Sequence, residues 1–198
     1  MTTLLTSVGP KSPSGLKVKA QSYASLEEVA DGIRGALPLQ QGQPFNLDCK
    51  RILEKTLPQA GFNYKIVESV DLDECAAFTI PEMELVVFRE DIYEMLQRDN
   101  VFGRSTVVHE MAHIVLKHAV TLSRGAQLGK HKFYEDSEWQ AKALTAAIMM
   151  PIQACREAAG KPAVLAEMCG TSVQSATFRL DNLVRNGRVA GQRHLFWQ

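Results

Sequence analysis

The chain has 198 residues, which suits one domain, or one domain with a small appendage, and leaves no room for two full-sized domains. Lys and Arg together number 22, and so do Asp and Glu, so the formal net charge of zero excludes a global attraction to nucleic acid or to an anionic membrane. The N-terminus lacks the features of a signal peptide, and no apolar run approaches the roughly 18 residues of a membrane-spanning helix. We therefore expect a soluble cytoplasmic protein with no membrane partner.

The cysteines are widely spaced and form no C-x-x-C pair. This spacing argues against a thiolate zinc site and against a scaffold held together by disulfides. We expect reduced thiols in the core at all four positions: Cys49, Cys75, Cys155 and Cys169.

The first part of the chain predicts an arm and two scaffold helices. Residues 1–22 are rich in Ser, Thr, Gly and Pro and show no hydrophobic period, which predicts a flexible arm. A serine followed three residues later by a glutamate is typical of a helix start and predicts a helix over residues 25–37. A second helix is expected over residues 47–57, with Asn46 as its cap.

Three β-prone runs follow, at residues 62–67, 76–80 and 84–88. The link between the last two runs, Pro81 to Met83, is short enough for a hairpin. We expect a small sheet, either as a cover for the next helix or with an edge strand that receives an extended substrate by main-chain pairing. A short helix is then expected over residues 91–98.

An H-E-x-x-H motif, His109 to His113, lies in an almost wholly apolar run. On a helix, positions i and i+4 share a face, so the two imidazoles can bind one metal ion. Glu110 can then take a proton from a water molecule that Zn²⁺ makes acidic. Two His and one Glu buried in an apolar helix would be costly without a metal or other partners, which favours a zinc site over a chance match.

The active-site helix is predicted over residues 106–118. On a regular helix His118 would lie about 180° around the axis from His109, so we expect it to point away from the metal. Residues 119–135 form a polar connection that should border the cleft. Within it, His131 and Tyr134 are candidate donors to a tetrahedral oxyanion, although a loop His or Tyr more commonly faces solvent.

A catalytic zinc site commonly has three protein ligands and an open position for water. The candidates for the third ligand are Glu135, Asp136 and Glu138, at the start of a helical segment that ends at Pro151. Asp136 or Ser137 can cap this helix. Periodicity alone does not choose among the three carboxylates.

Together, the two segments resemble the ImmA/IrrE metallopeptidases, whose pattern is H-E-L-x-H and, later, E-x-[EQ]-A-N-x-F-A-x-x-L-L-M-P. The second segment here runs from Glu138 to Pro151. It departs from the pattern where Lys142, Leu144 and Thr145 replace the usual Asn, Phe and Ala. The resemblance implies that His109, His113 and Glu138 bind Zn²⁺ and that Glu110 is the catalytic base.

The resemblance also implies an α+β, zincin-like fold, with a small β-sheet packed on the H-E-x-x-H helix and a helical C-terminal tail. The predicted peptidase core covers residues 23–151. We expect a zinc-dependent endopeptidase with a narrow substrate, a helix-turn-helix transcriptional repressor whose cleavage derepresses mobile-element or stress-response genes. The alternative is a non-catalytic, zinc-stabilised regulator that binds DNA or a protein partner through its C-terminal helices, although an intact Glu110 disfavours it.

Residues 152–198 resemble a helix-turn-helix, with Gly170 at the turn and Ser172 as the cap of the second helix. This tail has six Arg and Lys against three Asp and Glu, a small excess. In the family a similar tail packs on the peptidase core, so we expect docking and no direct DNA binding. If the tail did read DNA, the phosphate contacts would come from Arg179, Arg185, Arg188 and Arg193.

Overall fold

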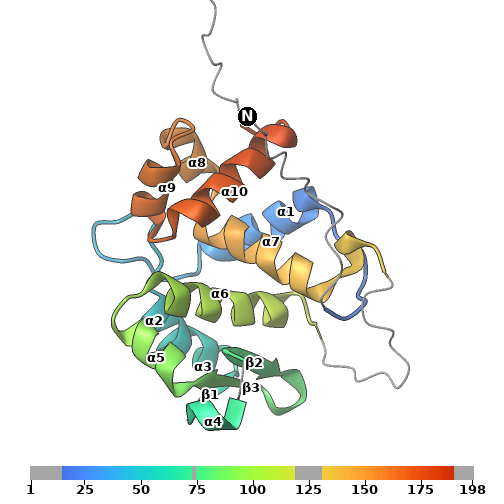
Figure 1. Ribbon diagram of the computed structural model, residues 1–198, viewed down its shortest axis with the longest axis vertical. Helices are drawn as coiled ribbons and strands as arrows, with labels where there is room; N and C mark the ends of the chain where they lie inside the picture. Colours follow the sequence, from blue (N-terminus) through green and yellow to red (C-terminus); the bar gives the residue numbers. More distant parts are fainter. Residues whose placement is uncertain (1–14, 73–74, 119–130, 190–198) are drawn as a thin grey trace, which may run out of the picture.

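The computed structural model describes residues 15–72, 75–118 and 131–189. It shows a mixed α+β fold with a three-stranded sheet and mostly helical content, as expected. Two helices, α6 (Val101–Val115) and α7 (Ser137–Met149), pack against each other across the middle of the molecule (Figure 1). The sheet lies on one side of this pair and the C-terminal helices lie on the other.

The strands are β1 (Asn63–Val67), β2 (Ala77–Ile80) and β3 (Leu85–Arg89). Their order is β1-β3-β2, with β1 parallel and β2 antiparallel to β3, so β2 is an edge strand. A 3-10 turn joins β2 to β3, and Glu84 closes it in the left-handed region with φ 49°. The predicted hairpin is confirmed, and β3 is buried at Val86, Val87 and Phe88 because it is the central strand.

The first helix, α1 (Tyr23–Arg34), begins and ends earlier than predicted. Its cap is Ser22, whose side chain accepts the N–H of Ser25 in a capping box. The predicted box at residue 25 was wrong because a serine three residues upstream already satisfies the first turn.

The second helical region starts at Asp48, whose carboxylate accepts the N–H of Arg51. It comprises α2 (Cys49–Arg51), a π-helical turn (Ile52–Thr56) and α3 (Leu57–Gln59). Asn46 is not the predicted cap. Its side-chain oxygen instead accepts a hydrogen bond from the buried guanidinium of Arg104, which also binds Leu47 and Gly170 through their carbonyl groups.

Two short helices follow strands of the sheet: α4 (Ser69–Leu72) comes after β1, and α5 (Glu90–Gln97) joins β3 to α6. Asp99 interrupts the helical path with φ 56°, and Asn100 caps α6 by accepting the N–H of Phe102. At Gly103 a side chain would collide with the main chain of Leu96, so glycine lets α5 and α6 approach closely. The helix α6 therefore begins at residue 101 and not at the predicted 106.

The C-terminal helices are α8 (Ile152–Glu157), α9 (Pro162–Cys169) and α10 (Val173–Arg185). Gly170, at φ 62°, ends α9, and Ser172 caps α10, at the positions the sequence predicted. The helix α10 docks through Arg179, which binds both carboxylate oxygens of Glu27 and the carbonyl oxygen of Met150. Arg179 is buried, so it is not available for the phosphate contact considered for the case that the tail reads DNA. Arg193 lies outside the described residues.

Residues 15–21, expected to belong to a flexible arm, instead lie extended along the start of α7. Main-chain hydrogen bonds join Val18 N–H to the carbonyl of Glu135 and Gln21 N–H to the carbonyl of Tyr134. The prediction failed here because these contacts are polar and leave no hydrophobic period. Residues 1–14 and 119–130, covered by the predictions of the arm and the polar connection, lie outside the described residues.

Two further expectations concern membrane-spanning helices and the cysteine thiols. Among the residues described, no helix has the length and apolar character needed to cross a membrane. Cys49, Cys155 and Cys169 are buried free thiols, whereas Cys75 is exposed, so its predicted place in the core was wrong. It lies outside the regular strand, just before β2 begins at Ala77.

Candidate metal centre

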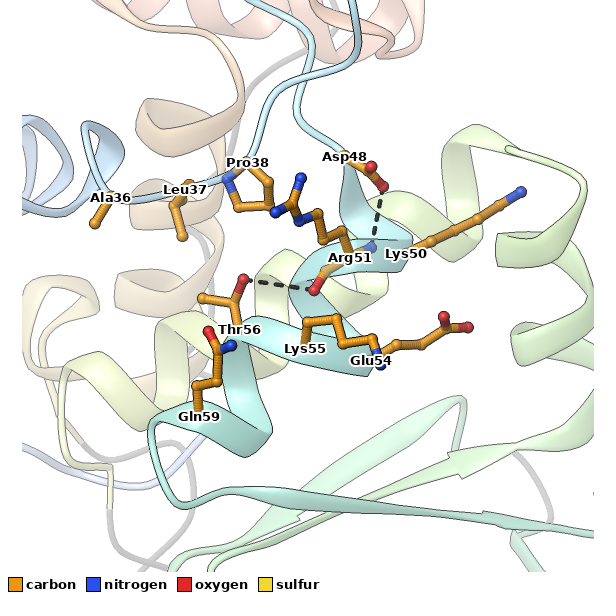
Figure 2. Close-up of a pocket in the computed structure, with 10 residues that line it drawn as sticks. All are labelled: Ala36, Leu37, Pro38, Asp48, Lys50, Arg51, Glu54, Lys55, Thr56 and Gln59. Carbon is orange, nitrogen blue, oxygen red and sulfur yellow. Dashed lines mark hydrogen bonds between the residues drawn. The ribbon is translucent and has the colours of Figure 1, made fainter.

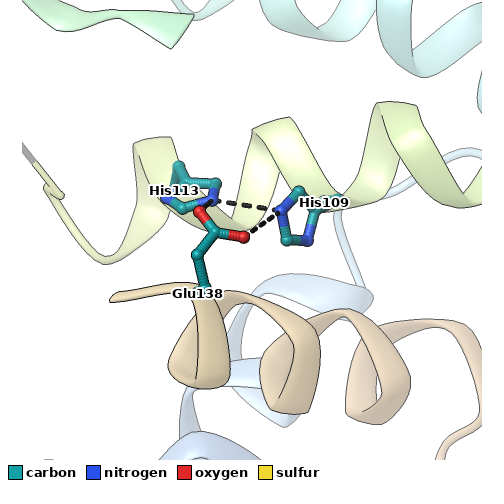
Figure 3. A group of neighbouring side chains, drawn as sticks. All are labelled: His109, His113 and Glu138. Carbon is teal, nitrogen blue, oxygen red and sulfur yellow. Dashed lines mark hydrogen bonds and ion pairs between the residues drawn. The ribbon is translucent and has the colours of Figure 1, made fainter. Parts of the chain in front are cut away.

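Three side chains from the two central helices converge at one point (Figure 3). His109 and His113 lie one turn apart on α6, and their Nε2 atoms are 3.2 Å from each other. Glu138, in the first turn of α7, places Oε2 at 3.3 Å from His109 Nε2 and Oε1 at 3.3 Å from His113 Nε2. All the candidate ligand atoms lie within 4.8 Å of one another.

These distances fit a single tetrahedral ion. Zinc bonds of about 2.0–2.1 Å in a tetrahedron place neighbouring ligand atoms about 3.4 Å apart, close to the three distances above. An unprotonated imidazole Nε2 and a carboxylate oxygen are both acceptors, so they converge favourably only around a cation or shared protons. The hydrogen bonds from His109 and His113 hold the pKa of Glu138 well below its usual range, which keeps it an anionic ligand.

Of the three carboxylates that the sequence left open, only Glu138 joins the two imidazoles. Asp136 is the cap of α7, where Oδ1 accepts the Trp139 N–H and Oδ2 accepts the Gly15 N–H. Glu135 accepts the main-chain N–H of Lys132. Both alternatives therefore have their oxygens occupied in local structure.

Glu110 lies beside the ligands but outside their group. It is buried, and its Oε2 accepts a hydrogen bond of 2.8 Å from the hydroxyl of Thr79 on β2. Burial raises the pKa of this carboxyl, and the Thr79 hydrogen bond opposes the rise. Thr79 was not predicted from the sequence. Its signal was a polar residue in the otherwise apolar strand Ala77–Ile80.

His118 does not point away, as predicted, because α6 ends at Val115. Lys117 turns the chain with φ 52°, and His118 N–H returns to the carbonyl of His113 at 3.0 Å. The ring of His118 then lies between the His113 ring, with an Nδ1–Nδ1 distance of 3.1 Å, and Gln140 Oε1, 3.1 Å from Nε2. Burial lowers the pKa of His118 and favours the neutral ring.

The structure does not bring His131 or Tyr134 into the ligand group. His131 Nε2 lies 2.9 Å from Asp136 Oδ2, and both side chains are almost fully buried. The Tyr134 ring lies under the amine of Lys132, which is 5.6 Å from its centroid. These contacts anchor the start of α7, and they do not support the oxyanion role considered for the two residues.

A surface cavity of about 740 Å³ lies elsewhere, between the segment after α1 and the helical region from α2 to α3 (Figure 2). Its lining mixes positive and negative side chains and includes no member of the ligand group. The residues that line it are Ala36, Leu37, Pro38, Asp48, Lys50, Arg51, Glu54, Lys55, Thr56 and Gln59.

Residues 103–181 match the family model Peptidase_M78, described as the IrrE N-terminal-like domain. The match begins in α6, contains all three ligands and Glu110, and ends in α10. It confirms the resemblance that the two sequence motifs indicated. A comparison with curated proteins found no match.

Proposed function

We propose that the chain is a zinc-dependent endopeptidase of the ImmA/IrrE family with a zincin-like site, on the basis of the match of residues 103–181 to the IrrE N-terminal-like domain. The observation that carries the proposal is the convergence of His109, His113 and Glu138 beside the buried carboxyl of Glu110. Three ligands of this kind suit a catalytic ion, because they leave a coordination position free for water or substrate.

Zinc bound there would acidify a water molecule and polarise the scissile carbonyl group. Glu110 accepts the proton of the attacking water and delivers it to the leaving amine. The hydrogen bond from Thr79 fixes Oε2 of this carboxylate, so Oε1 remains for proton transfer. Burial suits this role, because a carboxyl with a raised pKa is a stronger base near neutral pH.

The substrate is best explained as an extended segment of a protein. Within the described residues, β2 pairs with β3 on one side and is open on the other. Because Thr79 of β2 contacts Glu110, a peptide paired along the open edge of this strand would run beside the base. Main-chain pairing of this kind requires a loop or linker and excludes a segment held in a helix.

We propose a helix-turn-helix transcriptional repressor as the protein that supplies this segment, on the basis of the family. The balanced charge of the chain supports a protein substrate over DNA. The burial of Arg179 against Glu27 supports it too, since this arginine of α10 is unavailable to phosphates. The competing function, a zinc-stabilised regulator, would bind duplex DNA or a protein partner through its C-terminal helices and cleave nothing.

Replacement of Glu110 by Gln tests the proposal. We expect Glu110→Gln to slow cleavage of a purified, co-encoded repressor about 10²- to 10⁴-fold, because the variant lacks the base. Zinc content and thermal unfolding should stay close to those of the parent protein, because Glu110 is not a ligand. The matched control is Glu28→Gln, the same change at an exposed position on α1, which should cleave normally.

Cleavage by Glu110→Gln at the parent rate would refute the role of this residue. A parent protein that binds a specific duplex tightly in physiological salt, and cleaves no repressor, would instead support the regulator.

A further inference from the structure

The side-chain amide of Gln140 has a defined orientation. Its Nε2 atom lies 2.8 Å from the carbonyl oxygen of Lys19 and 2.8 Å from that of Tyr134. Two carbonyl oxygens can only accept, so the NH₂ group must face them. The amide oxygen of Gln140 must therefore face His118, and it can only accept a hydrogen bond there.

This orientation determines the tautomer of His118. Its Nε2 atom, 3.1 Å from Gln140 Oε1, must carry the proton. In the neutral ring, which burial favours, Nδ1 then has the lone pair. That lone pair lies 3.1 Å from Nδ1 of His113 and accepts a hydrogen bond only if His113 is protonated on Nδ1.

We propose that Gln140 and His118 are positioning residues that hold His113 in the tautomer with its lone pair on Nε2. This nitrogen is the one that lies beside His109 and Glu138. The chain of hydrogen bonds thus prepares His113 to bind a metal ion, and for a neutral His118 ring its direction follows from the two main-chain carbonyls that orient Gln140. A ligand imidazole whose second nitrogen is hydrogen-bonded is better oriented and more basic.

Local backbone conformation supports this role. His118 reaches His113 only because the left-handed turn at Lys117 reverses the chain directly after α6. Gln140 lies on α7, two residues after the ligand Glu138, so both helices of the site contribute to the chain of hydrogen bonds. Its last acceptor, Lys19, belongs to the extended segment 15–21, which links the N-terminal part of the protein to the ligand His113.

The inference rests on the proposed zinc site, and substitutions of His118 test it with zinc alone as the probe. His118→Phe keeps the ring shape and removes both nitrogens, so we expect the zinc affinity to fall about 10- to 100-fold in competition with a chelator. His118→Asn places an amide oxygen near the position of Nδ1 and should retain affinity within about tenfold of the parent. His118→Gln reaches Gln140 but leaves His113 without an acceptor, and should resemble the Phe variant.

Histidine nitrogen NMR of the zinc-loaded full-length protein provides a readout that packing alone would not change. We expect protonated Nε2 and unprotonated Nδ1 in His118, and a protonated Nδ1 in His113 that exchanges slowly with water. In His118→Phe this proton should exchange faster. In Gln140→Met, His118 should populate both tautomers, because its donor no longer has a fixed acceptor.

Equal loss of zinc affinity in the Phe, Gln and Asn variants would show that His118 contributes only packing against His113, and this would overturn the inference. The opposite proton pattern in the parent protein, or parent affinity in the Phe variant, would overturn it as well. A parent protein that binds zinc with the expected pattern but cleaves no repressor would refute the proposed function and leave this inference standing.

Discussion

Two polar clusters in this protein differ in chemistry: a buried one around Arg179 and a half-buried one at the candidate ligands. Around Arg179, every contact joins a donor to an acceptor: the guanidinium binds both oxygens of Glu27 and one main-chain carbonyl. Around His113, the Nε2 atoms of two imidazoles and the carboxylate of Glu138 converge at 3.2–3.3 Å. The first cluster is complete in itself, whereas the second becomes favourable only with a cation or with shared protons.

Burial of polar side chains alone therefore does not identify a functional site. The useful test is whether the donors and acceptors of the cluster match within the protein. In the Arg179 cluster the donors and acceptors match, so this cluster is a structural link between α10 and α1. The ligand group is matched only by shared protons or by a cation, which makes it a candidate metal centre.

The largest expected effect is on zinc affinity, which should depend on the ligand group and not on the Arg179 cluster. Glu138→Ala should lower zinc affinity by more than about 100-fold, beyond the usual effect of an outer hydrogen-bonding partner, because a ligand is lost. Glu135→Ala is the control, since that carboxylate binds the Lys132 N–H and lies 3.9 Å from the Lys17 amine. Chelator competition on both variants measures the effect. Similar zinc affinities in the two variants would show that Glu138 is not the third ligand.

Substitutions in the Arg179 cluster should lower the stability of the protein and leave its zinc affinity unchanged. Arg179→Met leaves the carboxylate of Glu27 buried without its partner, so we expect the free energy of unfolding to fall by about 3–5 kcal/mol. The double variant Arg179→Met, Glu27→Met should recover most of this loss, because an apolar pair needs no partner charge. Urea unfolding of the zinc-free proteins measures it. A double variant as unstable as the single one would contradict this account.

A partly exposed ion pair should give the smallest effect on stability. Arg89 Nε lies 2.7 Å from Asp91 Oδ1 near the start of α5, and this hydrogen bond holds the pKa of Asp91 below its usual value. Solvent screening limits the effect, so Asp91→Asn should cost at most about 1 kcal/mol at pH 7.

The lowered pKa of Asp91 also sets the direction of the pH dependence. Because the folded state has the lower pKa, the stabilisation is present above the unfolded value of about 3.9 and disappears as the pH falls below it. Urea unfolding of parent and variant at pH 7 and near pH 3.5 should show a difference that shrinks with acidity. A difference that grows with acidity would reverse the sign of the proposed interaction.

Local patterns predicted much of the fold and the ligand set. The strands were placed within one residue, because alternating β-prone runs and a short proline-containing link leave few options. The ligands followed from two motifs with defined spacing. Glu138 needed the family resemblance, since periodicity could not distinguish it from two neighbouring carboxylates that cap the helix and the preceding turn.

Long-range and irregular contacts could not be predicted in the same way. His118 was misplaced because a helix was extended through Lys117, a residue with no intrinsic preference for the left-handed region. The partner of Arg179, Glu27, lies 152 residues away and leaves no local pattern. The segment 15–21 is held by main-chain groups, which every sequence carries, so its composition resembled that of a free arm.

The sequence distance between contacting segments also has a consequence for synthesis of the protein. Gly15 binds Asp136, made 121 residues later, and Glu27 binds Arg179, made 152 residues later. Chains fold from the N-terminus as they leave the ribosome, but here residues 15–27 find their partners only after α7 and α10 have been made. We expect these segments to stay unpaired on the ribosome until α10 has emerged. The order of synthesis therefore delays the complete fold, and with it any activity of the candidate site, until residue 179 is outside the ribosome.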